Sequence, residues 1–176
     1  PSPITELTNN TDEILTAIDA MSPTGSTYVG EGAIWGVRVL SAEQPFTGGV
    51  PLGSQPTGND HKKNSLLLTD GENTMAPQFP SGEHILQEAE LANSNTQEAC
   101  QVARDAGIIV FTIAFGTEVK ETGQSLMTDC AGEGGRFYFA ADSAALLSAF
   151  DNIFARITTL RLSSLLTLCQ ILPFVC

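Results

Sequence analysis

The stretch Ser65-Leu66-Leu67-Leu68-Thr69-Asp70-Gly71-Glu72-Asn73 is an apolar run that stops at a carboxylate and continues into glycine and polar residues. This pattern predicts a short buried strand over residues 65–69 with Asp70 at its carboxyl end. In α/β folds, ligands bind beyond the carboxyl ends of the strands. Asp70 is therefore a candidate metal ligand or catalytic residue, and the alternative is an ordinary Asp-Gly turn.

A second candidate lies upstream, in the turn Gly25-Ser26-Thr27, which precedes a predicted helix beginning near Gly30. The turn places the hydroxyl of Thr27 near the N-terminus of that helix. A hydroxyl and a carboxylate from two separate loops suit a hard cation such as Mg²⁺, which prefers six oxygen ligands, several of them water. The alternative is that Thr27 is a simple helix cap.

The rest of the chain alternates between helices and strands. Residues 108–115 are a continuous apolar run apart from Thr112, which is typical of a strand buried on both faces of a parallel sheet. Residues 137–139 form a third predicted strand. Further helices are predicted over residues 11–21, 94–106, 126–131 and from Ser143, the last with the apolar face Leu146, Leu147, Phe150, Ile153, Phe154 and Ile157. This order predicts an α/β fold, a parallel sheet with flanking helices.

Local signals set the expected boundaries of these elements. Ile14, Leu15, Ile18 and Met21 share one face of the first helix. Ser94-Asn95-Thr96-Gln97-Glu98 is typical of a helix start, and Ser143 is the expected cap of the last helix. Residues 41–60 and 71–93 lack a period and are predicted to be long loops, the second with a helical turn around residues 85–92.

Composition limits the possible functions. The 176 residues are 42% hydrophobic and 16% charged, as in a globular domain with a sizeable core. The net charge of −12 argues against nucleic-acid binding, which needs clustered Lys and Arg. This charge is compatible with a cation or a basic partner, and also with solubility alone. His61 and His84 fall in predicted loops and are expected to be surface residues.

The four cysteines do not form a CxxC pair, so a structural zinc site is not expected. Cys100 and Cys130 each lie in a well-patterned segment, whereas Cys169 and Cys176 lie in the C-terminal tail. From spacing alone, the first two are either a disulfide or two buried free thiols.

Several of these motifs together resemble a von Willebrand factor type A domain. They are Gly25-Ser26-Thr27, the run from Leu66 to Gly71, and Ile113-Ala114-Phe115-Gly116. More closely, the chain is similar to the C-terminal region of Tad-type (tight adherence) pilus-assembly proteins of the TadG kind. That similarity spans roughly residues 3–162 and is carried by residues 3–8, 35–41, 45–46, 69–74, 112–115 and 137–140, by Cys100, Cys130 and Ala131, and by residues 160–162.

The resemblance implies a metal-ion-dependent adhesion site, which the family builds from an Asp-x-Ser-x-Ser loop, a Thr and an Asp. Thr27 and Asp70 match the second and third parts, and the first part does not occur in this sequence. We therefore expect a partial Rossmann-like von Willebrand A domain whose first strands are missing. The strand over residues 65–69 would then be an exposed apolar edge. The chain alone would bind Mg²⁺, Mn²⁺ or Ca²⁺ weakly or not at all, and its full-length parent would bind it.

The resemblance also implies a setting outside the inner membrane, in the periplasm or cell envelope, with a pilus or envelope protein as partner. That setting favours a disulfide between Cys100 and Cys130. The resemblance further implies that the parent is anchored by an N-terminal transmembrane segment that does not occur in this sequence. The longest apolar stretch here, residues 162–176, is shorter than the roughly 20 residues that a membrane span needs. The start at Pro1 is expected to be an internal cut. Residues 1–162 would be the partial domain, and residues 163–176 an apolar tail of unknown role.

Two alternatives to this non-catalytic, cation-dependent adhesion module remain open. The first is a metal-assisted hydrolase that uses Asp70 and Glu72, although the sequence has no Ser-His-Asp or Cys-His arrangement and no phosphate-binding loop. The second is a cytosolic von Willebrand A-like partner of an ATPase or chelatase, in which the cysteines would be reduced.

Overall fold

A computed structural model describes residues 3–22, 25–51, 62–78, 84–86, 88–134 and 136–171, and for residues 84–86 and 159–171 it describes the backbone alone. His61, Cys176, the side chains of His84 and Cys169, and part of the predicted loop over residues 41–60 lie outside this description.

Three parallel strands form the central sheet, in the order β1-β4-β5. These strands are β1 (Asn64–Thr69), β4 (Ile109–Phe115) and β5 (Phe137–Ala140). Residues 110–114 of β4 are all buried, as the continuous apolar run of the sequence predicts. The predicted parallel α/β sheet is therefore confirmed.

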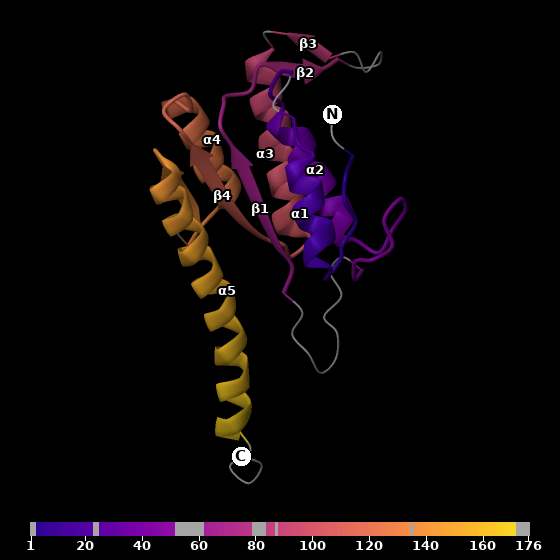
Figure 1. Ribbon diagram of the computed structural model, residues 1–176, viewed down its shortest axis with the longest axis vertical. Coiled ribbons are helices and arrows are strands. Elements are labelled where there is room, and N and C mark those ends of the chain that lie inside the picture. The colour runs from indigo at the N-terminus through magenta and orange to yellow at the C-terminus, as the bar shows by residue number, and fades with distance from the viewer. Residues whose placement is uncertain are drawn as a thin grey trace.

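Helices cover both faces of this sheet (Figure 1). One face carries α2 (Val29–Leu40), α3 (Ala89–Asp105) and α4 (Glu121–Ala131), and the other carries α5 (Ser143–Ile171). Beneath α5, Phe111 and Ile113 of β4 pack against Ala149 and Ile153. The opposite core joins α2, α3 and α4 to the sheet through Ala33, Ala99, Cys100, Cys130 and Leu67. On this same side of the sheet, Val110 of β4 packs with Val37 of α2 and Ala103 of α3 in a further cluster, so both faces of β4 are buried.

A disulfide between Cys100 of α3 and Cys130 of α4 lies inside the second cluster. Both half-cystines are almost completely buried, at 1% and 0% exposed. The guanidinium of Arg104 on α3 donates hydrogen bonds to the carbonyls of Asp129 and Cys130, at 3.0 and 2.7 Å. Covalent and polar links therefore join the same two helices.

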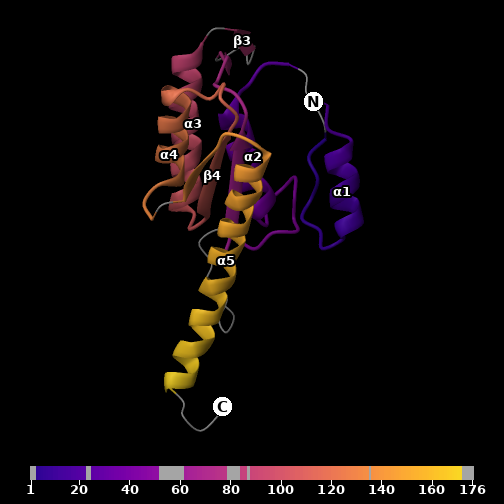
Figure 2. The same cartoon turned by 60° about the vertical axis from the view of Figure 1, so that its left-hand side comes forward.

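The first helix, α1 (Thr11–Asp19), forms as predicted but stands apart from the core. Asn10 caps it by accepting hydrogen bonds from the amides of Asp12 and Glu13. Its predicted apolar face is exposed, with Leu15 at 53% and Ile18 at 52%. In Figure 2, α1 lies on the far side of α2 from α4.

The predicted loop over residues 71–93 is interrupted by two short strands and by the start of a helix. Strands β2 (Met75–Pro77) and β3 (His84–Leu86) pair as an antiparallel hairpin. Helix α3 begins at Ala89, inside the predicted helical turn around residues 85–92 and before the expected start at Ser94. Strands of three residues are too short to show an alternating pattern. The expected cap at Ser94 instead lies within α3, where the hydroxyl of Thr96 donates to the carbonyl of Ala92. Ser and Thr side chains can form such bonds inside a helix as well as at its start, so these residues alone do not mark a helix boundary.

Two further helix boundaries also differ from the prediction. Helix α4 begins at Glu121, five residues before the predicted start. Asp142 rather than Ser143 caps α5, because its carboxylate accepts a hydrogen bond from the amide of Ala145. The predicted apolar face of α5 is divided: Leu146, Ile153 and Ile157 pack on the sheet, whereas Leu147, Phe150 and Phe154 are 67%, 42% and 70% exposed.

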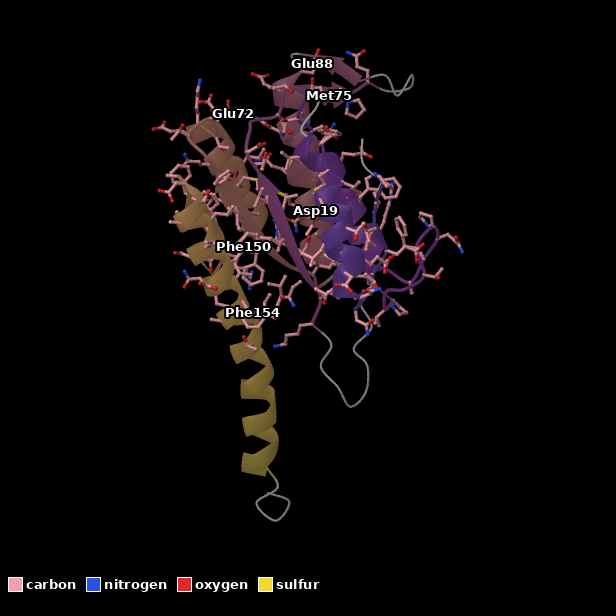
Figure 3. All side chains as sticks on the ribbon, in the orientation of Figure 1. Asp19, Glu72, Met75, Glu88, Phe150 and Phe154 are labelled. Carbon is pink, nitrogen blue, oxygen red and sulfur yellow. A yellow bond between two sulfur atoms is a disulfide. The ribbon has the colours of Figure 1, made fainter. Side chains whose placement is uncertain are left out.

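Strand β1 has a strand neighbour on one side only among the described residues, as expected for an open edge. Leu67 points into the core beneath α2 and α3, and Leu66 and Leu68 point to the face covered by α5. Because α5 lies over β4 and β5, Leu66 and Leu68 remain 40% and 43% exposed. Figure 3 shows Phe150 and Phe154 projecting from α5 on the side of β1. An unpaired strand flanked by exposed apolar side chains favours self-association.

We predict that Leu68→Lys lowers self-association, because a charge on an edge strand opposes pairing with another edge. The matched control is Val102→Lys, which places the same charge at a similarly exposed site (48%) on α3. Sedimentation velocity should show a larger monomer fraction for Leu68→Lys alone. Equal monomer fractions for the two variants would contradict a role for the β1 edge in self-association.

The disulfide gives a second prediction. It closes a loop with a sequence separation of 30, for which chain entropy gives about 3 to 4 kcal/mol of stabilisation. Replacing Cys100 and Cys130 together by Ala should therefore lower the free energy of unfolding by about that amount, measured by urea titration. Peptide mapping of the unmodified protein without reductant should recover the linked peptides. Two free thiols in that map would contradict the pairing.

Candidate functional site

Asp70 lies at the carboxyl end of β1, as the sequence predicts, and its side chain is exposed. The turn that carries it is fixed by Thr69, which is 7% exposed. The Thr69 hydroxyl donates to the carbonyl of Gly71 at 2.8 Å and lies 3.3 Å from the Gly71 amide. The buried side chain of Thr69 thus stabilises the turn that carries Asp70.

The loop that carries Thr27 lies against the loop that follows Asp70. The amide of Thr27 donates to the hydroxyl of Thr74 at 2.9 Å, and the amide of Thr74 donates to the carbonyl of Thr27 at 2.9 Å. A Cβ atom built on Gly71 would lie 3.4 Å from the hydroxyl oxygen of Thr27. The structure therefore brings the Thr27 hydroxyl next to the residue that follows Asp70.

Thr27 is not the cap of α2, which was the alternative reading of its position. The N-cap residue is Tyr28, and its side chain supplies no cap hydrogen bond. The side chain of Asn73 supplies one instead, accepting from the amide of Val29 at 2.7 Å. Sequence reasoning gave Asn73 no role, because a cap from 44 positions away leaves no local signal.

Glu72, the second carboxylate of the hydrolase alternative, is turned toward α4. Its Oε1 atom accepts a hydrogen bond from the amide of Gly123 at 3.2 Å. Figure 3 shows Glu72 near the same end of the molecule as Met75, beside the start of α4. One oxygen of Glu72 therefore stabilises the first turn of α4.

The donors brought together here are oxygen atoms, which fits the chemistry of Mg²⁺, Mn²⁺ or Ca²⁺. Within the described ranges, no three or more His, Cys, Asp or Glu side chains gather in an arrangement that could hold a metal ion. Thr27 and Asp70 would therefore leave most of an octahedral shell to water and to other ligands. Lys63 has a pKa lowered by partial burial, but it lies at the opposite end of β1 from Asp70.

A parallel sheet covered by helices, with a hydroxyl and a carboxylate in adjacent loops beyond the strand end, defines a Rossmann-like binding domain. The chain belongs to the family of the von Willebrand factor type A domain, whose model matches residues 2–152.

Solved structures share this fold. The pilus adhesin SpaC from Lactobacillus rhamnosus GG aligns with a TM-score of 0.57 and 19% identity, over 84% of this chain and 21% of SpaC. The proximal thread matrix protein 1 of the mussel byssus aligns with a TM-score of 0.53 and 20% identity, over 81% of this chain and 30% of that protein. The chain thus spans less than a third of either neighbour. No curated protein sequence matches it.

The packing beneath the site gives a third prediction. A Cβ on Gly30 would lie 3.1 Å from the Thr96 hydroxyl oxygen and 3.2 Å from the Thr96 Cα, so Gly30→Ala should push α2 away from α3. We expect it to destabilise the fold by about 1 to 3 kcal/mol. The control is Gly32→Ala in the same helix, where the nearest atom, Leu67 Cδ1, is 3.8 Å away. This control should stabilise by up to about 1 kcal/mol through helix propensity.

Urea unfolding measures both variants. A Gly30→Ala protein as stable as Gly32→Ala would contradict the close approach of the two helices.

Proposed function

We propose that this chain is a non-catalytic, cation-dependent protein-binding module that acts in adhesion, within the assembly of Tad (Flp) pili. The observation that carries the proposal is the pair of hydrogen bonds between Thr27 and Thr74, which brings the Thr27 hydroxyl beside the Asp70 turn. Membership of the von Willebrand factor type A family supports protein binding. The Tad assignment rests on the sequence resemblance over residues 3–162, and the pilus adhesin among the structural neighbours agrees with it in fold.

In this proposal Thr27 and Asp70 supply one hydroxyl and one carboxylate to Mg²⁺, or to Mn²⁺ or Ca²⁺. The ion supplies positive charge that attracts an acidic side chain of the partner. The exposed position of Asp70 leaves room for such a side chain to approach. Two protein ligands make affinity weak in this chain, and the Asp-x-Ser-x-Ser loop of a longer parent would raise it.

The hydrolase alternative gains less support from the same geometry. Glu72 would have to act beside Asp70, but one of its carboxylate oxygens accepts the Gly123 amide. A hydrolase needs its base free to reach a water molecule at the reacting centre. The binding function requires no such group, and it is the function that the described side chains favour.

The proposed location is outside the cytoplasm, in the cell envelope. The buried disulfide between Cys100 and Cys130 supports it, because disulfides persist in oxidising compartments. A cytosolic partner of an ATPase would carry reduced cysteines there. Among the described helices, none is long and apolar enough to cross a membrane. The proposed anchor to the inner membrane belongs to the parent protein.

Titration of Mn²⁺, followed by the electron paramagnetic resonance of the free ion, tests the site. We expect weak binding by the 176-residue chain, in the millimolar range typical of weak extracellular sites. Asp70→Asn should remove that binding, because it removes the anionic ligand. The matched control, Asp151→Asn, changes an exposed carboxylate on α5 and should leave binding unchanged.

Two outcomes would contradict the proposal. Micromolar binding by this chain would show that its site is not the incomplete one proposed here. Equal binding by Asp70→Asn and Asp151→Asn would show that Asp70 is not a ligand.

A further inference from the structure

The side chain of Asn73 connects three elements beneath the site. It is 5% exposed, and its Oδ1 atom accepts the amide of Val29 at the start of α2. Its Nδ2 atom donates to Asn93 Oδ1 at 2.9 Å and to Thr96 Oγ1 at 3.2 Å, both on α3. One buried amide therefore joins the loop after β1 to two helices.

The orientation of this amide follows from its neighbours. The hydroxyl hydrogen of Thr96 is directed to the carbonyl of Ala92, 2.7 Å away, so the Thr96 oxygen acts as an acceptor toward Asn73. The amide nitrogen of Asn73 must then face α3 and its oxygen must face α2. This orientation satisfies the Val29 amide, which is buried and belongs to the first turn of α2.

The loops of Asp70 and Thr27 are held by different side chains. Thr69 fixes the Asp70 turn through its bonds to Gly71. Asn73 and Thr74 fix the loop of Thr27, through Val29 and through Thr27 itself. Thr74 is exposed and exchanges its bonds with water, whereas Asn73 is buried and its bonds have no such substitute.

We propose that Asn73 is the positioning residue of the cation site, holding the Thr27 hydroxyl in place beside Asp70 without contacting the ion. The part of this proposal that concerns the cation rests on the proposed function. The part that concerns the position of Thr27 rests only on hydrogen bonds within the chain. The test therefore has one readout that needs no cation and one that does.

The first readout is amide hydrogen exchange, followed residue by residue by NMR in the full 176-residue protein. Asn73→Leu keeps a side chain of similar shape but removes all three hydrogen bonds. Exchange at Val29 should accelerate by about tenfold or more, because its amide loses its buried acceptor at the start of α2. Exchange at Ile113, in the buried centre of β4, should be unchanged. If Asn73→Leu does not fold, Asn73→Ala replaces it in the same comparison.

Two further variants separate positioning from general destabilisation. Asn73→Asp keeps an oxygen that accepts the Val29 amide at the N-terminus of α2, so protection of Val29 should return in part. Its second oxygen cannot donate to Asn93 and Thr96, so those two hydrogen bonds are lost. Thr96→Val removes one acceptor on α3 and leaves the bond between Asn73 and Val29, so Val29 should exchange at the wild-type rate within about threefold. If Asn73 only stabilised the fold, Thr96→Val would accelerate exchange at Val29 as Asn73→Leu does.

The second readout is the broadening of amide signals by Mn²⁺ in the same samples. In the wild-type protein, the signals of Thr27 and Asp70 should both broaden. In Asn73→Leu, broadening should persist at Asp70, whose turn is held by Thr69, and should be lost at Thr27.

The outcomes distinguish the two proposals. Unchanged exchange at Val29 in Asn73→Leu would overturn the positioning role, whatever the cation does. No broadening at Thr27 or Asp70 in the wild-type protein would overturn the cation site and leave the exchange result to decide on Asn73. Equal loss of broadening at both residues in Asn73→Leu would also overturn the positioning role.

Discussion

The hydrogen bond from the Val29 amide to the buried side chain of Asn73 is the contact on which the site depends. It caps α2 from a loop that is distant in sequence, and so it fixes the start of that helix against the end of β1. Thr27 lies just before this start, and Asp70 lies just before Asn73. The position of one candidate ligand relative to the other is therefore set by a cap.

The rest of the domain supports that contact. On α3, Asn93 and Thr96 accept hydrogen bonds from the amide nitrogen of Asn73. Helix α2 can approach α3 closely because Gly30 has no side chain. The disulfide joins α3 to α4. In the first turn of α4, the amide of Gly123 donates to Glu72, which lies in the same loop after β1 as Asn73. Beneath them, β4 supplies the buried surface on which the helices rest. The site is thus at the end of a layer of three connected helices. The free edge of β1 and the flank of α5 carry exposed apolar side chains.

The sequence predicted the elements whose signals are local. The apolar run of β4, the position of Asp70 at a strand end and the alternation of helices with strands could each be read from a few neighbouring residues. The hairpin of β2 and β3 could not, because strands of three residues show no period. The role of Asn73 could not either, because its partners Val29 and Asn93 lie 44 and 20 positions away. The helical period of α5 predicted its apolar face, but it could not show which of those side chains a neighbour covers.

The central claim is that the loops of Thr27 and Asp70 form one unit in the folded chain. Through-space NMR measurement of the distance between the Thr27 side chain and the α protons of Gly71 tests this most directly. The account predicts a cross-peak, because the Thr27 hydroxyl oxygen lies 3.4 Å from the position that a Gly71 Cβ would take. The absence of a cross-peak in a folded sample, with both residues assigned, would contradict it.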